Sequence, residues 1–190
     1  MSQYICVDIG GTSIKHGVLD ENAIIKECNQ TKTEAWLGGA AVLDKVKTIG
    51  KQYKEQYENI EGICISTAGM VDPEEGKIVF AGELMPGYTG TCIKKELEKA
   101  LEMPCEVEND VNCAGLAEYV SGSAKESHIM FCATVGTVIG GCAIVNGRVF
   151  HGASNSACEV GYIPMGDSDF QTLGASSILV RKVAEKKIEP

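Results

Sequence analysis

The stretch VDIGGTSIKHGVLD, from Val7 to Asp20, decides the fold of the first part of the chain. An apolar run, Tyr4 to Val7, predicts a buried strand, and a second run, Ser13 to Leu19, begins a few residues later. The short interval between the two runs predicts a tight turn, and the stretch AIIKEC that follows Asp20 adds a third strand. We therefore expect a three-stranded meander at the start of the chain.

The turn carries Gly10, Gly11 and Thr12, a composition with two interpretations. Glycines leave backbone N–H groups open to bind an anion, and the threonine hydroxyl adds a donor. Asp8, at the end of the strand, could hold a hydrated Mg²⁺ that bridges phosphate oxygens, and Lys15 would add positive charge. An ordinary tight turn uses the same residue types, so the turn alone does not decide between the two interpretations.

Composition narrows the class of protein. The chain has 190 residues, is 44% hydrophobic and carries a formal net charge of -9 at pH 7. This acidic balance disfavours nucleic acid and anionic membranes as partners, because both require a basic surface. No apolar run approaches the roughly 20 residues that span a bilayer, and MSQYICVDIGG lacks the features of a signal peptide. We expect a cytoplasmic protein.

The nine cysteines are scattered and form no CxxC pair. Most lie in apolar runs such as YICVDI and GICIS, where cysteine acts as a small buried hydrophobe. A disulfide framework or a zinc site would need clustered cysteines. We therefore predict reduced thiols in the core.

Helices and strands alternate along the rest of the chain. The sequence pattern predicts helices over 39–57, 93–101, 111–120 and 175–187, and strands over 60–66, 104–110, 128–135 and 138–145. Residues 73–88 are expected to form a loop with one short strand, KIVF, and Asn146-Gly147 predicts a type I′ turn. Gly136 and Thr137 form a second glycine–threonine turn between two strands, and this echo suggests two similar lobes.

Three polar residues follow predicted strands. Asn109 and Asp110 stand where a strand ends and a helix begins, which fits either helix capping or contact with a substrate hydroxyl. Glu159, in the stretch CEVGY, comes after the second hairpin. Each residue has an ordinary structural explanation when it is taken singly.

Five motifs in order resemble the ROK family of sugar kinases and repressors, which includes glucokinases and N-acetylmannosamine kinases. The motifs are DIGGTSIKHGVLD, ISTAGMVDPEEGKIV, ENDVNCAGLAE, TVGTVIGGCAIVNGRVFHG and EVGY. The resemblance implies an α/β actin/hexokinase-like (ribonuclease H-like) ATPase fold with two lobes around a cleft. It implies a complete N-terminal lobe over residues 1–112 and an incomplete C-terminal lobe over residues 113–190. The implied activity is ATP-dependent phosphorylation of a hexose or an N-acetylhexosamine, at the 6-hydroxyl.

The resemblance also assigns roles to residues. The cofactors would be ATP and Mg²⁺, with Asp8 reaching the metal through water. Asp110 would be the catalytic base that accepts the proton of the sugar hydroxyl. The phosphate hairpins would comprise Asp8, Gly10, Gly11, Thr12 and Lys15 in the first and Gly136 and Thr137 in the second, and the sugar would lie against Gly69, Asn109, Glu159 and Tyr162.

The sequence departs from the family in four respects. Val138 replaces a glycine of the second hairpin and would be strained if the backbone needed a positive φ there. Tyr162 replaces the usual histidine, and IPMGDSDFQTLGASS replaces the cysteine-rich loop, so we expect no structural zinc site. Family members continue for roughly a hundred residues more, a common domain's worth. We therefore expect an incomplete ATP site and uncovered apolar surface, which self-association would be one way to cover.

Three functions stay open at this point. The first is a sugar kinase, or a fragment of one. The second is a catalytically inactive sugar-binding relic, which Val138, the lost zinc loop and the short C-terminal part favour. The third is a repressor without its DNA-binding segment, which the acidic charge and the start of the hairpin near residue 4 disfavour. The sequence does not identify the sugar.

Overall fold

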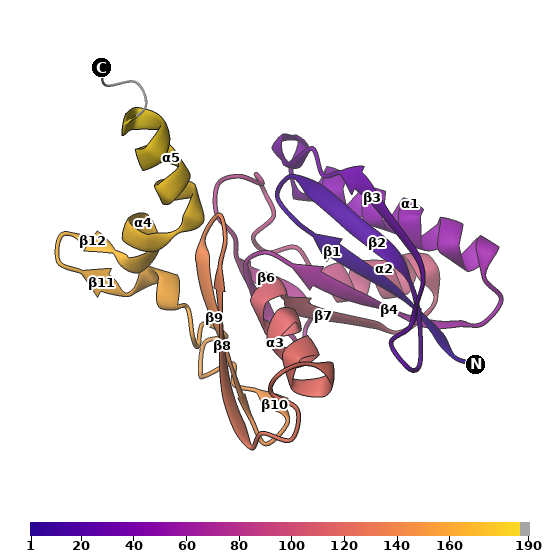
Figure 1. The fold of residues 1–190 in the computed structure, drawn as a ribbon. Helices are drawn as coiled ribbons and strands as arrows, with labels where there is room; N and C mark the ends of the chain where they lie inside the picture. Colours follow the sequence, from indigo (N-terminus) through magenta and orange to yellow (C-terminus); the bar gives the residue numbers. More distant parts are fainter. Residues whose placement is uncertain (187–190) are drawn as a thin grey trace. The chain divides into compact units, whose positions relative to one another are not determined.

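The computed structural model describes residues 1–186, which divide into two compact units (Figure 1). The first unit is Met1–Asp110, and the second begins at Val111.

A five-stranded sheet forms the centre of the first unit, in the order β3-β2-β1-β4-β7. Strands β1, β2 and β3 pair antiparallel, whereas β4 and β7 run parallel to β1. The expected meander is therefore confirmed. The strands are β1 (Gln3–Ile9), β2 (Ser13–Asp20), β3 (Ile25–Lys32), β4 (Ile60–Thr67) and β7 (Cys105–Asn109).

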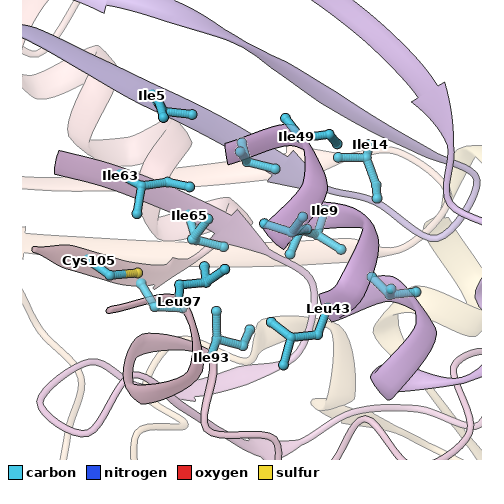
Figure 2. Packing of buried hydrophobic residues seen from close by; sticks show 14 of the residues in the cluster. Ile5, Ile9, Ile14, Leu43, Ile49, Ile63, Ile65, Ile93, Leu97 and Cys105 are labelled. Carbon is cyan, nitrogen blue, oxygen red and sulfur yellow. The ribbon is translucent and has the colours of Figure 1, made fainter. Parts of the chain in front are cut away.

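Two helices cover one face of this sheet, and their apolar residues form its core (Figure 2). Alternate residues Ile5, Val7 and Ile9 of β1 are buried on this face. At Gly50 of α1 (Gly39–Gln56) a Cβ would lie 2.6 Å from Leu101 of α2 (Ile93–Leu101), so this glycine lets the helices approach closely. The unit also contains η1 (Ala35–Leu37), α1 (Gly39–Gln56), β5 (Met70–Asp72), β6 (Lys77–Phe80) and α2 (Ile93–Leu101).

The second unit has a smaller sheet, in the order β10-β9-β8. Met130, Cys142 and Ile144 form its buried cluster. A Cβ at Gly115 of α3 would lie 2.6 Å from the Cys142 sulfur, so α3 packs closely on β9. The elements are α3 (Asp110–Ser121), β8 (Ile129–Val135), β9 (Ile139–Val145), β10 (Arg148–Val149), η2 (Val160–Tyr162), β11 (Pro164–Met165), β12 (Ser168–Asp169), α4 (Phe170–Gly174) and α5 (Ser176–Lys186).

Most of the expected elements are confirmed. Asn146 and Gly147 have φ values of 50° and 79°, as a type I′ turn requires. The last helix extends to Lys186, and Lys187 lies outside the described residues. Strand β5 and helix α4 were not expected, because both are too short to show a clear period.

The prediction of core cysteines is wrong. Only Cys105 and Cys142 are buried, and Cys28 and Cys64 are exposed. Side chains alternate along a strand, so the Cys64 side chain lies on the opposite face from the buried Ile63 and Ile65.

Candidate functional site

The sheet of the first unit aligns polar residues in one row across its strands. Asp8 pairs with Lys15 on one side and with Ser66 on the other, and Ser66 pairs with Glu108. Residues that are paired in register share a face, so these four side chains lie on the same face of the sheet. The Ser66 hydroxyl donates to Asp8 Oδ1 at 2.8 Å, which fixes the orientation of this carboxylate.

The first glycine hairpin differs in one respect from the expectation. The Gly10 N–H is not open to an anion, because it donates to the Ser13 carbonyl at 3.1 Å and closes the hairpin. Neither Gly10 nor Gly11 has a positive φ. A Cβ at Gly10 would lie 3.0 Å from the Ser13 carbonyl, whereas a Cβ at Gly11 would have nothing within 4 Å. The open part of the turn is therefore Gly11 and Thr12, whose N–H groups donate to no acceptor within residues 1–186.

Thr33, directly after β3, holds this hairpin in place by hydrogen bonds, although no sequence pattern marks it as a site residue. Its side chain is fully buried, its hydroxyl donates to the Gly10 carbonyl at 2.6 Å, and its N–H donates to the Thr12 carbonyl at 3.1 Å. Lys45 of α1 donates in turn to the Thr33 carbonyl at 3.0 Å and forms an ion pair with Glu34. The hydrogen bond from Lys45 lowers the pKa of the Glu34 carboxyl. The position of the turn is thus set by residues more than twenty positions along the chain.

A second group of predicted site residues meets at the end of β7. The Asn109 side-chain amide donates to the Gly69 carbonyl at 2.9 Å and to Asp110 Oδ1 at 3.0 Å. Gly69 has a φ of 102°, and a Cβ there would lie 2.7 Å from the Phe80 carbonyl, so only glycine fits. Asp110 is exposed and is the first residue of α3, where a carboxylate is favoured by the helix dipole. Both interpretations of Asp110 therefore remain compatible with its position.

The two groups are connected through β4. Thr67 pairs with both Ile9 and Asn109, and the Ala68 N–H donates to the Ile9 carbonyl at 3.4 Å. The Thr67 hydroxyl also bonds the Tyr88 hydroxyl at 2.7 Å in the interior. Burial raises the pKa of Tyr88 to about 12.

The second glycine–threonine hairpin lies in the second unit. Val138 has no positive φ and is exposed, so the strain expected from a β-branched residue is absent. The Gly136 N–H donates to the Val138 carbonyl at 2.9 Å. The first residues of α5 hold the turn from outside: the Ser176 N–H donates to the Gly136 carbonyl at 3.0 Å, and the Ser177 hydroxyl donates to the Thr137 carbonyl at 2.7 Å. Sequence reasoning missed both serines.

The stretch CEVGY is anchored to the second sheet by its glycine. A Cβ at Gly161 would lie 2.3 Å from the Ile139 carbonyl of β9. Glu159, half-buried, directly precedes η2, and Tyr162 ends it with an exposed ring. Glu159, Tyr162 and the second hairpin thus belong to the second unit, whereas the residues from Asp8 to Asp110 belong to the first.

Residues 1–186 were searched for metal-binding clusters of side chains and for helices that could cross a membrane. Within this part of the chain, no group of three or more His, Cys, Asp or Glu side chains is arranged to hold a metal ion. No helix there has both the length and the hydropathy that crossing a bilayer requires.

Comparison with known proteins identifies the family. The chain matches the ROK family over residues 4–175, and it therefore belongs to that family. It is 49% identical over 191 residues to an uncharacterised protein of Clostridium perfringens, covering 100% of this chain and 64% of that protein. It is 33% identical over 156 residues to a beta-glucoside kinase of Listeria monocytogenes, covering 82% of this chain and 51% of the kinase.

Solved structures agree with this result. The ROK family glucokinase from Streptomyces griseus, solved in complex with glucose and AMPPNP, superposes with a TM-score of 0.84 at 26% identity and covers 97% of this chain and 61% of that one. The expected α/β actin/hexokinase-like fold with a partial second lobe is thus confirmed. The chain spans less than two thirds of the length of each of these relatives.

Proposed function

We propose that this chain carries the acceptor site of an ATP-dependent sugar kinase that phosphorylates the 6-hydroxyl of a hexose or an N-acetylhexosamine. The observation that carries the proposal is the Asn109 amide, which joins the Gly69 carbonyl to the Asp110 carboxylate at the end of β7. Relatives named glucokinase and beta-glucoside kinase support the reaction class.

Asp110 is the proposed general base. A sugar hydroxyl is a poor nucleophile, and its proton must leave as the bond to phosphorus forms. The exposed Asp110 carboxylate can accept that proton, and its bond from the Asn109 amide fixes its orientation. A base placed in this way contributes about 10²–10⁴-fold to the rate.

The first hairpin suits a phosphate chain with its metal. The space where a Cβ of Gly11 would stand is open, and the Gly11 and Thr12 N–H groups have no acceptor within residues 1–186. Asp8 Oδ1 is held by Ser66, and Asp8 Oδ2 accepts no hydrogen bond in the same part of the chain, so it can receive one from metal-bound water. When bound, MgATP would supply the phosphoryl group and the countercharge for it. In this proposal Lys15 also faces phosphate. The roles that the family resemblance assigns to Gly136, Thr137, Glu159 and Tyr162, which all lie in the second unit, stay predictions.

The test is phosphoryl transfer from MgATP to glucose, N-acetylglucosamine and N-acetylmannosamine by the 190-residue chain. We expect turnover with at least one sugar and a loss of about 10²–10⁴-fold in Asp110→Asn. Asp44→Asn is the matched control, because Asp44 is an exposed aspartate on α1. It should keep full activity.

Two other results would contradict the proposal. Turnover that survives in Asp110→Asn would remove the proposed base. Sugar binding without any turnover would favour the inactive sugar-binding protein instead.

A further inference from the structure

The peptide group between Gly10 and Gly11 in the first hairpin is held from one side only. The Thr33 hydroxyl donates to the Gly10 carbonyl at 2.6 Å. A trans peptide points its C=O and its N–H in opposite directions, so this bond also directs the Gly11 N–H away from Thr33. The Gly11 N–H has no acceptor within residues 1–186, and a Cβ at Gly11 would have nothing within 4 Å. A backbone donor directed into open space in this way can bind an anion.

The segment that carries Thr33 is itself fixed to α1. Lys45 of α1 donates to the Thr33 carbonyl at 3.0 Å and to the Lys32 carbonyl at 3.2 Å. Glu34 has a φ of 53°, which a residue with a side chain rarely adopts, and its carboxylate forms an ion pair with Lys45. Backbone strain of this kind persists where the surrounding contacts over-determine the conformation, and it is common at functional sites. Thr33 is therefore a fixed point from which the hairpin is oriented.

The second glycine–threonine turn has the same arrangement with different donors. The Gly136 carbonyl accepts from the Ser176 hydroxyl at 2.5 Å and from the Ser176 N–H at 3.0 Å, and the Thr137 carbonyl accepts from the Ser177 hydroxyl at 2.7 Å. The Thr137 N–H, which shares a peptide group with the Gly136 carbonyl, has no acceptor among the described residues. In both turns, a hydroxyl from a distant segment thus holds the carbonyl of the first glycine and leaves the next N–H open. Because the donors differ, the feature that the turns share is the orientation of this peptide group.

We propose that Thr33 is a positioning residue for phosphate binding at the first hairpin, where it keeps the Gly10 carbonyl away from the phosphate and the Gly11 N–H toward it. This role rests on the proposed function, in which the hairpin binds the phosphate chain of ATP. A peptide group that rotated would present an acceptor to the anion in place of a donor. Thr33 does not touch the phosphate and acts through the peptide group between Gly10 and Gly11.

The test is a titration of the isotopically labelled 190-residue chain with magnesium tripolyphosphate, read from the amide resonances of Gly11 and Thr12. This probe supplies a phosphate chain without adenine or sugar. In the unmodified chain we expect both resonances to shift and to saturate. Thr33→Val removes the hydroxyl but keeps the shape of the side chain, and it should bind about tenfold more weakly, as for the loss of one hydrogen bond to a charged group. Thr33→Ser keeps the hydroxyl and should restore the affinity to within about twofold.

Thr89→Val is the matched control for the loss of a threonine hydroxyl that holds a loop elsewhere in the first unit. The Thr89 hydroxyl accepts from the Ala81 N–H at 3.0 Å. The substitution is the same and changes no charge, so this variant should bind magnesium tripolyphosphate as the unmodified chain does. Equal weakening in Thr89→Val and Thr33→Val would show a general effect on the fold and would overturn the proposal.

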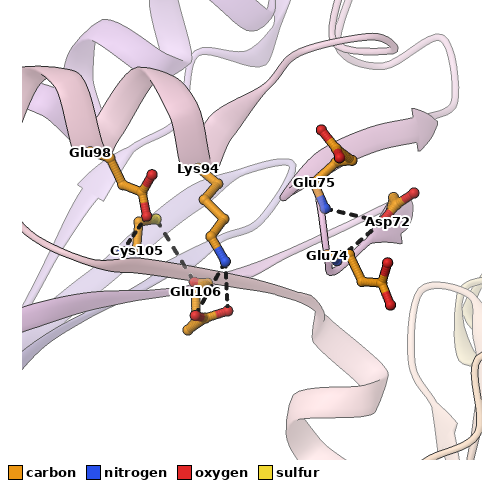
Figure 3. A network of polar contacts seen from close by, with 7 residues as sticks. All are labelled: Asp72, Glu74, Glu75, Lys94, Glu98, Cys105 and Glu106. Carbon is orange, nitrogen blue, oxygen red and sulfur yellow. Dashed lines mark hydrogen bonds and ion pairs between the residues drawn. The ribbon is translucent and has the colours of Figure 1, made fainter.

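Lys45→Met gives a second test that leaves the buried Thr33 unchanged. Without the bonds from Lys45 to the Lys32 and Thr33 carbonyls, Thr33 is less firmly fixed, and we expect about threefold weaker binding of the probe. Lys94→Met is the matched control, because Lys94 also forms an ion pair with a glutamate, Glu106 of β7 (Figure 3). It loses the same charge and should bind the probe as the unmodified chain does. If Thr33→Val does not fold, equal affinities of Lys45→Met and Lys94→Met overturn the proposal.

The remaining outcomes separate this proposal from the proposed function. Equal affinity of Thr33→Val and the unmodified chain would overturn the role of Thr33, as would a loss that Thr33→Ser does not restore. No shift of the Gly11 and Thr12 resonances in the unmodified chain would overturn both this role and the phosphate site of the proposed function. Phosphate binding that depends on Thr33, without phosphoryl transfer to any sugar, would support this role and contradict the proposed function alone.

Discussion

The buried hydrogen bond between Thr67 and Tyr88 leads to a prediction about stability that is asymmetric. Both side chains are almost fully buried, at 0% and 1% exposed, and their oxygens lie 2.7 Å apart. The Thr67 hydroxyl also donates to the Ala68 carbonyl at 3.3 Å, so Tyr88 is the donor in the pair when both bonds form. Replacing Thr67 leaves the buried Tyr88 hydroxyl without an acceptor. Removing the Tyr88 hydroxyl leaves the Thr67 hydroxyl bonded to the Ala68 carbonyl.

The magnitudes follow from this arrangement. Thr67→Val should cost about 1–3 kcal/mol, the penalty for a buried polar group without its partner. Tyr88→Phe should cost about 0.5–1.5 kcal/mol, the net contribution of one hydrogen bond. The double variant should be no less stable than Thr67→Val alone, because it contains no buried hydroxyl without a hydrogen-bond partner.

Urea unfolding followed by circular dichroism measures the three differences. Trp36, the chain's one tryptophan, lies in the first unit, so its fluorescence reports on that unit. Thr48→Val, at an exposed position of α1, is the matched control and should change stability by less than about 0.5 kcal/mol. The reasoning is refuted if Thr67→Val costs no more than this control, or if the two single effects simply add.

Two further predictions concern a pair of glycines and a histidine. Gly17→Ala should destabilise by more than about 2 kcal/mol in urea unfolding, because its Cβ would lie 2.0 Å from the Glu27 carbonyl, whereas Gly11→Ala, with nothing within 4 Å, should fold normally. Equal stability of the two variants would contradict the packing of β2 on β3. Burial lowers the pKa of His16, whose ring bonds the Tyr53 hydroxyl at 2.9 Å, so the unfolded chain binds a proton more readily. The free energy of unfolding should therefore fall as the pH drops below about 6.5. Unfolding curves at pH 7.5 and 5.5 should show a smaller fall for His16→Gln than for the unmodified chain. An equal fall in both proteins would contradict this role of His16.

Local patterns predicted the elements that carry the site. The two apolar runs, Tyr4 to Val7 and Ser13 to Leu19, predicted the hairpin, and the polar residues at the end of one strand singled out Asn109 and Asp110. These signals are local, because strand and helix periods depend on neighbouring residues. The family motifs added the proposed roles.

The supports of the site were not predictable, because their partners lie far along the chain. Ser66 is 58 residues from Asp8, and Thr33 is 23 residues from Gly10. No local pattern marks a serine or a threonine as the partner of a distant group.

The prediction that the cysteines are buried in the core was wrong for a related reason. An apolar run such as GICIS shows that a strand is present but not which face a helix covers, so the exposure of Cys64 depends on where α1 and α2 pack. The strain at Val138 was conditional on a positive φ, and that condition, which came from the family pattern, does not hold in this chain.

The measurement that tests the central claim most directly is sugar binding and phosphoryl transfer on the same sample of Asp110→Asn, beside the unmodified chain. Equilibrium dialysis with labelled sugar gives binding, and label transferred from MgATP gives chemistry. The account predicts that Asp110→Asn binds the sugar within a few-fold of the unmodified chain but forms about 10²–10⁴-fold less product per unit time. Equal product formation by both proteins would contradict the account.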